Sequence, residues 1–264
     1  MDSDFEFHAA LAALSWQIEL GADEALAEAP FARYEEKPAS APVVATEPRR
    51  AVPVQQMAPA ADKDIAVRVA REMSAGAQSL EALREALDAY DHCELKRGAR
   101  NLVFSDGNAR ARVMILGEAP GAEEDREGRP FVGRAGQLLD RMLAAIGLSR
   151  QAPDAEQAVY ITNIMVWRPP GNRDPSPEEI AMMLPFVERH IALVDPDVLL
   201  LMGNTPCTAI LGQRGILRLR GKWTQGLGRA VMPMTHPAYL LRNPIAKREA
   251  WADLLEIRAK LEGK

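Results

Sequence analysis

Cysteine is scarce in this chain of 264 residues, which contains only Cys93 and Cys207. The two lie far apart in the sequence and form no Cys-x-x-Cys pair. One chain therefore cannot build a disulfide framework or a metal site with four thiolates. We expect both cysteines to be buried thiols rather than reactive ones.

A long apolar run is also lacking. No stretch approaches the roughly 18 residues that a membrane-spanning helix requires. The first residues, "MDSDFEFHAA", carry acids where a signal peptide carries basic residues. With 47% hydrophobic and 26% charged residues, the composition is that of a soluble globular protein. These features predict a cytoplasmic protein without membrane contact.

Acidic residues are missing from one long segment. Residues 214–248 contain eight Lys or Arg and no Asp or Glu, although the net charge of the chain is −5. Residues 1–36 hold nine acids and one base, so the rest of the chain is net positive. A local positive field attracts phosphate backbones, which indicates a nucleic-acid partner. A solvated basic face without a partner is the alternative.

Composition divides the chain into three regions. Residues 1–36 are acidic, and an amphipathic pattern over residues 4–20 predicts a helix that docks on the domain or on a protein partner. Residues 37–62 contain five prolines, many alanines and no periodic pattern, as in a flexible linker. Residues 63–264 form the predicted folded domain, in which Ser79 can cap an early helix.

Short apolar runs alternate with helical patterns in the folded domain. The runs cover residues 113–116, 159–162, 198–202 and 230–234, and the helical patterns cover 134–146, 177–193, 204–211 and 245–261. This alternation is typical of a parallel sheet that is buried on both faces. The sequence thus predicts an α/β fold, a three-layer α/β/α arrangement with a central four-stranded parallel sheet. In such folds the functional loops follow the carboxyl ends of the strands.

The loop after the first run, "LGEAPGAEEDREGRPFVG", combines glycines, acids and an aromatic residue. Gly117 lets another group approach the backbone closely. A carboxylate that points inward, such as Glu118 or Glu124, can orient or activate water. Each feature also has an ordinary interpretation: a turn, a solvated acidic bulge and, for Phe131, a core aromatic. A Rossmann-type nucleotide site is disfavoured because the acids would face the phosphates.

The other three strand ends carry polar side chains. Asn163 directly follows the second run and is either a turn residue or an amide that reads the edge of a base. Gly203 and Asn204 open a helix whose backbone N–H groups can hold a phosphate. In "THPAYLLRNP", His236 precedes leucines that suit an apolar wedge for a base stack, with an arginine to hold a phosphate. Together the loops carry the residue types that a base-flipping enzyme requires.

On these motifs the chain resembles the uracil-DNA glycosylase superfamily, and within it the family 4 type. The resemblance covers Leu80 to the C-terminus. It rests on "LVFSDGNARARVMILGEAPGAEEDREGRPFVGRAGQLLDRML", "YITNIMVWRPPGNRDPSPEEI", "VLLLMGNTPCTAIL" and "THPAYLLRNP", which occur in the family's order. It implies excision of uracil from DNA by cleavage of the N-glycosidic bond, which leaves an abasic site.

The resemblance also implies a role for each matching residue. Phe131 would stack on the flipped uracil, Asn163 would read its N3 and O4 edge and reject cytosine, and His236 would hydrogen-bond O2 as the base departs. The implied uracil-binding set is Gly117, Glu118, Ala119, Phe131, Asn163 and His236. The implied DNA-binding set is Gly203, Asn204, Tyr239, Leu240, Leu241, Arg242 and Arg173.

Two roles are assigned to alternatives. Glu124 is the first candidate to orient the attacking water and Glu118 is the second. In superfamily members with a "GQDPYH" loop an aspartate activates the water, and Ala119 stands at that position here. Either Leu240 or Leu241 would fill the gap that the flipped base leaves.

Family 4 members usually bind a 4Fe-4S cluster through four cysteines. The corresponding positions here are Tyr90, Cys93, Trp167 and Met183. One thiolate cannot hold such a cluster, so we expect a protein without a metal cofactor. Aromatic and polarizable side chains would fill the space of the cluster. This expectation predicts a colourless purified protein.

The leading interpretation is a monofunctional uracil-DNA glycosylase that acts as a monomer on uracil-containing DNA, in association with the nucleoid. The alternative is a non-catalytic DNA-binding relative, a recruiting module whose N-terminal helix engages a repair or replication partner. The pocket residues discriminate between them. A binding module does not need Phe131, Asn163 and His236 together.

Overall fold

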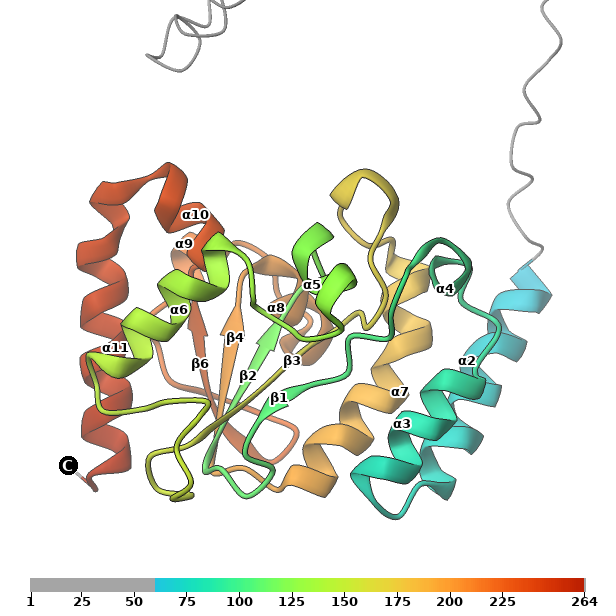
Figure 1. The fold of residues 1–264 in the computed structure, drawn as a ribbon, viewed down its shortest axis with the longest axis horizontal. Coiled ribbons are helices and arrows are strands. Elements are labelled where there is room, and N and C mark those ends of the chain that lie inside the picture. The colour runs from blue at the N-terminus through green and yellow to red at the C-terminus, as the bar shows by residue number, and fades with distance from the viewer. Residues whose placement is uncertain (1–59, 264) are drawn as a thin grey trace, which may run out of the picture. The chain divides into compact units, whose positions relative to one another are not determined.

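The computed structural model describes residues 60–263 (Figure 1). The helix predicted over residues 4–20 and most of the predicted linker lie outside this range. The first described helix begins at Ala60, inside the range predicted as linker. The elements are α2 (Ala60–Gly76), α3 (Leu80–Ala89), α4 (Leu95–Gly98), β1 (Asp106–Gly107), β2 (Val113–Gly117), α5 (Ala122–Glu127), α6 (Arg134–Ala144), β3 (Val159–Asn163), η1 (Pro170–Asn172), α7 (Pro177–Val194), β4 (Val198–Met202), α8 (Asn204–Leu211), α9 (Ile216–Leu219), β5 (Thr224–Gly226), β6 (Arg229–Met234), α10 (Pro237–Arg242), η2 (Pro244–Ala246) and α11 (Lys247–Leu261).

The strands form one six-stranded sheet in the order β1-β3-β2-β4-β6-β5. Neighbouring strands among β3, β2, β4 and β6 pair in parallel, which confirms the predicted four-stranded parallel sheet. Two edge strands, β1 and β5, add antiparallel pairs that the sequence pattern does not indicate. They have two and three residues, and each includes a glycine, so neither shows a strand pattern.

Helices cover both faces of the sheet, so both faces are buried. Successive side chains of a strand point to opposite sides and therefore enter different cores. In β2, Met114 and Leu116 belong to a core shared with α2, α3, α7 and α8, whereas Val113 and Ile115 belong to a core shared with α6 and α11. Figure 1 shows α6 and α11 along one side of the sheet and α2, α3 and α7 along the other. The predicted three layers are therefore confirmed.

Local signals set the helix ends. Ser79 Oγ accepts a hydrogen bond of 3.2 Å from Ala82 N–H and caps α3, as the sequence predicts. Ser176 and Glu179 form a capping box at the start of α7. Within the described range, every helix falls short of the length or the apolarity that a bilayer crossing demands.

The parallel strands end at one common edge of the sheet. Gly117 pairs in register with Asn163 at the ends of β2 and β3, and Met202 pairs with Met234 at the ends of β4 and β6. The loops that follow carry α5, η1 and α10, which lie at the top of Figure 1. Segments that are distant in the sequence therefore meet beyond this edge.

Candidate active site

A pocket of about 330 Å³ opens beyond the carboxyl ends of the strands. It gathers most of the side chains predicted to contact the base. The lining residues are Glu118, Ala119, Pro120, Gly121, Glu124, Phe131, Ala135, Asn163, Pro169, Asn172, Arg173, His236, Ala238 and Arg242. The predicted residues outside the lining are Gly117, Gly203, Asn204, Tyr239, Leu240 and Leu241.

Gly117 supports the pocket from beneath. A β-carbon at position 117 would lie 2.2 Å from Asn163 Oδ1 and 2.6 Å from Phe131 Cε2, so only glycine fits. The Asn163 side chain is buried and lines the pocket, and its amide has no hydrogen-bond partner among the described residues. Its acceptor and its donors are therefore available to a ligand.

Phe131 supplies a flat wall. Its ring is buried, and the ring centroid lies 5.4 Å from that of His236 with an interplanar angle of 29°. Its backbone has a φ of 53°, in the left-handed region that costs a residue with a side chain about 1–2 kcal/mol. Neighbouring groups must hold a backbone that is strained in this way.

His236 is the N-cap of α10. The N–H of Ala238 donates to His236 Nδ1 at 3.1 Å, so the proton of the neutral ring lies on Nε2. Burial lowers the pKa of His236 to about 4, with a further contribution from Arg242, while Glu124 opposes the shift. At neutral pH the ring is therefore uncharged and its Nε2–H is a donor.

Glu118 directly follows β2 and is partly buried. Thr205 Oγ1 donates a hydrogen bond of 2.5 Å to Glu118 Oε2, and Oε1 has no partner among the described residues. Burial raises the pKa of Glu118; the Thr205 hydrogen bond opposes this, Asp174 adds to it, and Arg214 opposes it. A carboxylate with one unoccupied oxygen and a raised pKa is suited to take a proton from water.

Glu124 lines the same pocket, but backbone donors occupy its carboxylate. Oε1 accepts from the N–H groups of Val132 and Gly133 at 3.0 and 2.9 Å, and Oε2 accepts from the N–H of Gly121 at 3.1 Å. Glu124 thereby closes the capping box of α5 and joins α5 to the start of α6. The geometry thus favours Glu118 over Glu124 as the group that meets water, the reverse of the order expected from the sequence.

The leucines after His236 do not form an exposed wedge. Leu240 is only 1% exposed and packs with Leu138 and Ala250, so its burial does not support the predicted insertion into DNA. Tyr239 and Leu241 are partly buried against the same cluster. The apolar character of this loop comes mainly from packing onto α6 and α11.

Two neighbouring side chains are exposed instead. The Arg242 side chain lines the pocket and makes no hydrogen bond or ion pair within residues 60–263. Ile245, in η2, is 93% exposed, and the sequence pattern does not distinguish it from the leucines before it. Arg173 also lines the pocket, but its Nη2 lies 2.6 Å from Glu179 Oε1, so its charge is already paired.

The predicted phosphate site at the start of α8 is partly occupied by the protein itself. The N–H of Gly203 donates to Met234 O at 2.9 Å, so this donor is not available to a phosphate. Asn204 Oδ1 accepts from the N–H groups of Gly215 and Ile216 at 3.0 and 2.9 Å, so this side chain holds the start of α9. Of the groups of Gly203 and Asn204, the main-chain N–H of Asn204 stays a candidate.

Two residues that support the site are absent from the sequence-based assignment. Thr205 holds Glu118, and Arg150 Nη2 donates to Phe131 O at 3.0 Å. Each contact joins segments far apart in the chain. A polar residue soon after a strand is a weak signal for Thr205, and a single arginine in a loop is no signal at all.

The residues at the cluster positions pack as core. Tyr90, Cys93, Trp167 and Met183 are all buried in one apolar cluster. The Tyr90 hydroxyl donates to Ala66 O at 2.9 Å, and burial raises the pKa of the Cys93 thiol to about 11. Residues 63–263 contain no group of three or more His, Cys, Asp or Glu that could hold a metal ion. These side chains do not fit a 4Fe-4S cluster, because Cys93 is the one cysteine among the four positions and the other three cannot supply a thiolate.

Comparison with known proteins agrees with the geometry. A family model described as uracil DNA glycosylase superfamily matches residues 104–255. The type-4 uracil-DNA glycosylase of Thermotoga maritima is 39% identical over 167 residues, which cover 62% of this chain and 84% of the relative. Those of Sulfurisphaera tokodaii and Saccharolobus solfataricus are 36% identical over 190 residues and 34% identical over 196, covering 68% and 70% of this chain and 84% and 88% of the relatives. The chain therefore belongs to the uracil-DNA glycosylase superfamily.

Proposed function

We propose that the protein is a monofunctional uracil-DNA glycosylase, which flips uracil out of DNA and hydrolyses its N-glycosidic bond to leave an abasic site. The observation that carries the proposal is one pocket lined by the Phe131 ring, the Asn163 amide and the neutral His236 ring. The names of the relatives support the same activity.

Asn163 reads the base while Phe131 stacks on it. Uracil presents an N3–H donor beside the O4 acceptor, and a side-chain amide offers the matching acceptor and donor. Cytosine presents the reverse pattern at these two positions, with an acceptor at N3 and an amino donor at N4, and would leave buried polar groups unpaired. One buried amide therefore supplies the discrimination between the two pyrimidines.

His236 stabilises the departing base. When the bond between C1′ and N1 breaks, its electron pair passes to the uracil ring and negative charge develops on O2. The Nε2–H of His236 donates to that oxygen, as in an oxyanion hole. The hydrogen bond from Ala238 to Nδ1 fixes the required tautomer before the substrate binds.

Glu118 activates the attacking water. The sugar becomes an oxocarbenium-like cation, the water oxygen bonds to C1′, and the water proton passes to Glu118 Oε1. The carboxylate also stabilises the cationic sugar while it is ionised. Glu124 instead keeps α5 and the Phe131 segment in place through its backbone hydrogen bonds.

The loop after β6 holds the DNA. Arg242 binds a backbone phosphate, and Ile245 enters the space that the flipped base leaves in the stack, since it is the exposed apolar side chain of this loop. Leu240 supports the loop from the core, and Leu241 and Tyr239 shape its surface. The N–H of Asn204 and the side chain of Arg173 make secondary backbone contacts.

The remaining features of the proposal concern the whole chain. The enzyme works as a monomer. It needs no 4Fe-4S cluster, because apolar packing at Tyr90, Cys93, Trp167 and Met183 supplies that part of the core. It acts in the cytoplasm, in association with the nucleoid, where its DNA substrate lies. Residues 1–36 engage a protein partner, residues 37–59 link them to the domain whose first helix begins at Ala60, and this domain carries the activity.

The test uses the full-length chain and duplex or single-stranded oligonucleotides with one uracil, followed by alkaline cleavage of abasic sites. We expect cleavage at uracil and none at cytosine in the matched strand. Strong DNA binding without cleavage would instead identify a non-catalytic recruiting module.

A further inference from the structure

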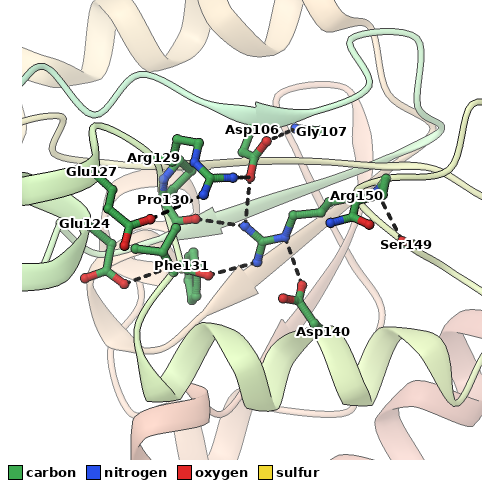
Figure 2. Close-up of polar contacts among 12 residues, drawn as sticks. Asp106, Gly107, Glu124, Glu127, Arg129, Pro130, Phe131, Asp140, Ser149 and Arg150 are labelled. Atoms are coloured by element: carbon green, nitrogen blue, oxygen red, sulfur yellow. Dashed lines mark hydrogen bonds and ion pairs between the residues drawn. The ribbon is translucent and has the colours of Figure 1, made fainter.

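The segment from Pro130 to Gly133 carries the aromatic ring assigned to the base. Its backbone is strained at Phe131, where φ is 53°. The ring has no polar atom with which to hold this conformation. The restraint must therefore come from other elements, and Figure 2 shows polar contacts that reach the segment.

Arg150 holds the carbonyl side of this segment. Its Nη1 donates to Pro130 O at 2.9 Å and its Nη2 to Phe131 O at 3.0 Å, so one guanidinium spans two consecutive carbonyls. Nη1 also donates to Asp106 Oδ2 at 3.1 Å and Nε to Asp140 Oδ1 at 2.9 Å. The side chain is only 8% exposed, and the two carboxylates balance its charge (Figure 2).

Other groups restrain the same segment. Glu124 Oε1 accepts the N–H groups of Val132 and Gly133, so donors and acceptors of the segment are both held. Gly136 of α6 packs against it so closely that a β-carbon there would lie 1.8 Å from Phe131 O. The backbone carrying the ring is thus fixed by contacts from α5, α6 and the loop that precedes β3.

We propose that Arg150 is a positioning residue for base recognition, which holds the Phe131 backbone so that its ring faces the base before DNA arrives. The inference rests on the proposed role of Phe131 and extends it to a residue outside the pocket lining. Because Arg150 acts through the ring, its loss slows excision and leaves the grip on undamaged DNA unchanged.

Lysine cannot replace this arginine. A lysine keeps the positive charge between Asp106 and Asp140, but a single ammonium lacks the planar fork that meets two carbonyls side by side. Arg150→Lys therefore removes the clamp and retains the charge balance. The matched control is Arg112→Lys, since Arg112 also bridges two carboxylates, Glu156 and Asp197, and does not line the pocket.

The experiment is a double-mutant cycle in the full-length protein, with single-turnover excision of uracil as the readout. We expect Arg150→Lys to lower the rate about 10- to 100-fold in the wild-type background, as misplacement of about 1 Å does. In a Phe131→Ala background the same change should have almost no further effect, because the ring it positions is gone. Arg112→Lys should leave the rate unchanged in both backgrounds.

Equal losses in the two backgrounds would overturn the inference, as would an equal loss in the Arg112→Lys control. Gly136→Ala supplies a second variant from another element, because its β-carbon displaces the same carbonyl, and we expect the same dependence on Phe131.

A readout without catalysis separates this inference from the proposed function. Amide ¹H–¹⁵N shifts of Val132 and Gly133 should change in Arg150→Lys and stay in place in Arg112→Lys. If wild type fails to release uracil, the proposed function is wrong, and these shifts alone decide the clamp. Unchanged shifts would contradict it.

Discussion

The pocket wall formed around Phe131 and Asn163 and the loop that follows β6 meet at one pocket, but they are held in different ways. In the wall, Gly117, Phe131 and Asn163 are buried, and Glu124 and Arg150 bind the backbone around the ring. In the loop, Arg242 and Ile245 are exposed to solvent. Under the proposed function, base recognition is thus preorganised, whereas Arg242 and Ile245 find their partners when a duplex arrives. Substitutions in the wall should change the chemical step, and those in the loop should change binding and flipping.

The largest effect should follow from His236→Ala. Loss of the Nε2–H donor removes stabilisation of the departing base and should lower the single-turnover rate about 10²- to 10³-fold, with little change in DNA affinity. The exposed His92 provides the control, since His92→Ala should leave both quantities unchanged. A matching loss of affinity in the His236 variant would contradict its place in the wall.

The next largest effect should distinguish the roles of the two carboxylates, Glu118 and Glu124. Glu118→Gln should lower the rate about 10²-fold, as removal of a general base does. Glu124→Gln should lower the melting temperature, because Glu124 holds three backbone N–H groups, and should slow excision less than Glu118→Gln does. Rates and melting curves of both variants measure this. The assignment fails if Glu124→Gln is the slower enzyme and folds as stably as wild type.

Ile245→Ala should have an intermediate effect. Loss of the apolar wedge should slow excision from duplex DNA about 10-fold and have less effect on single-stranded DNA, where no stack needs to be opened. Leu217→Ala is the matched control, because Leu217 is 58% exposed and lies outside the pocket lining. Equal slowing on both substrates would remove Ile245 from the flipping step.

Arg242→Ala should act on affinity alone. One lost phosphate contact should weaken DNA binding several-fold and reduce the slope of log K against log salt by about one. Arg173→Ala should change the slope less, because Arg173 is already paired with Glu179. Titrations at several salt concentrations measure both. An unchanged slope for Arg242→Ala would show that no phosphate lies there.

The smallest effect is expected from His236 in the pH dependence of the excision rate, where its titration should not be visible near neutral pH. Its pKa is lowered to about 4, so the neutral donor persists through pH 6.5, the ordinary midpoint of a histidine. The acid limb of the wild-type rate should belong to Glu118, whose pKa is raised from 4.5, since the carboxylate is the active form and is lost as pH falls. In Glu118→Gln the residual rate should stay flat until the pH approaches about 4. A residual limb near 6.5 would assign an ordinary pKa to His236.

Local patterns predicted the parallel strands, the three layers and several of the side chains that line the pocket. These follow from short-range rules: a continuously apolar strand marks a buried sheet, and its carboxyl end marks the functional edge. Asn163 and His236 stand directly at such ends, so the register of the sheet was enough to bring them to one edge.

The parts beyond the reach of the sequence depend on tertiary contacts. Which leucine is buried depends on how α10 packs on α6, and Leu240 proved to be core. Which carboxylate already accepts hydrogen bonds from the protein depends on backbone donors that only folding brings together, as at Glu124. Arg150 follows α6 and reaches back to Phe131, which precedes that helix, and no periodicity reports such a contact.

The central claim is that the pocket presents a neutral, prealigned His236 to the departing base, and its ring nitrogens test this most directly. Long-range ¹H–¹⁵N correlation spectra of the full-length protein, recorded from pH 8 downward, report the tautomer and the titration midpoint. We predict a proton on Nε2, none on Nδ1, and a midpoint of about 4. A proton on Nδ1, or a midpoint near 6.5, would contradict the account.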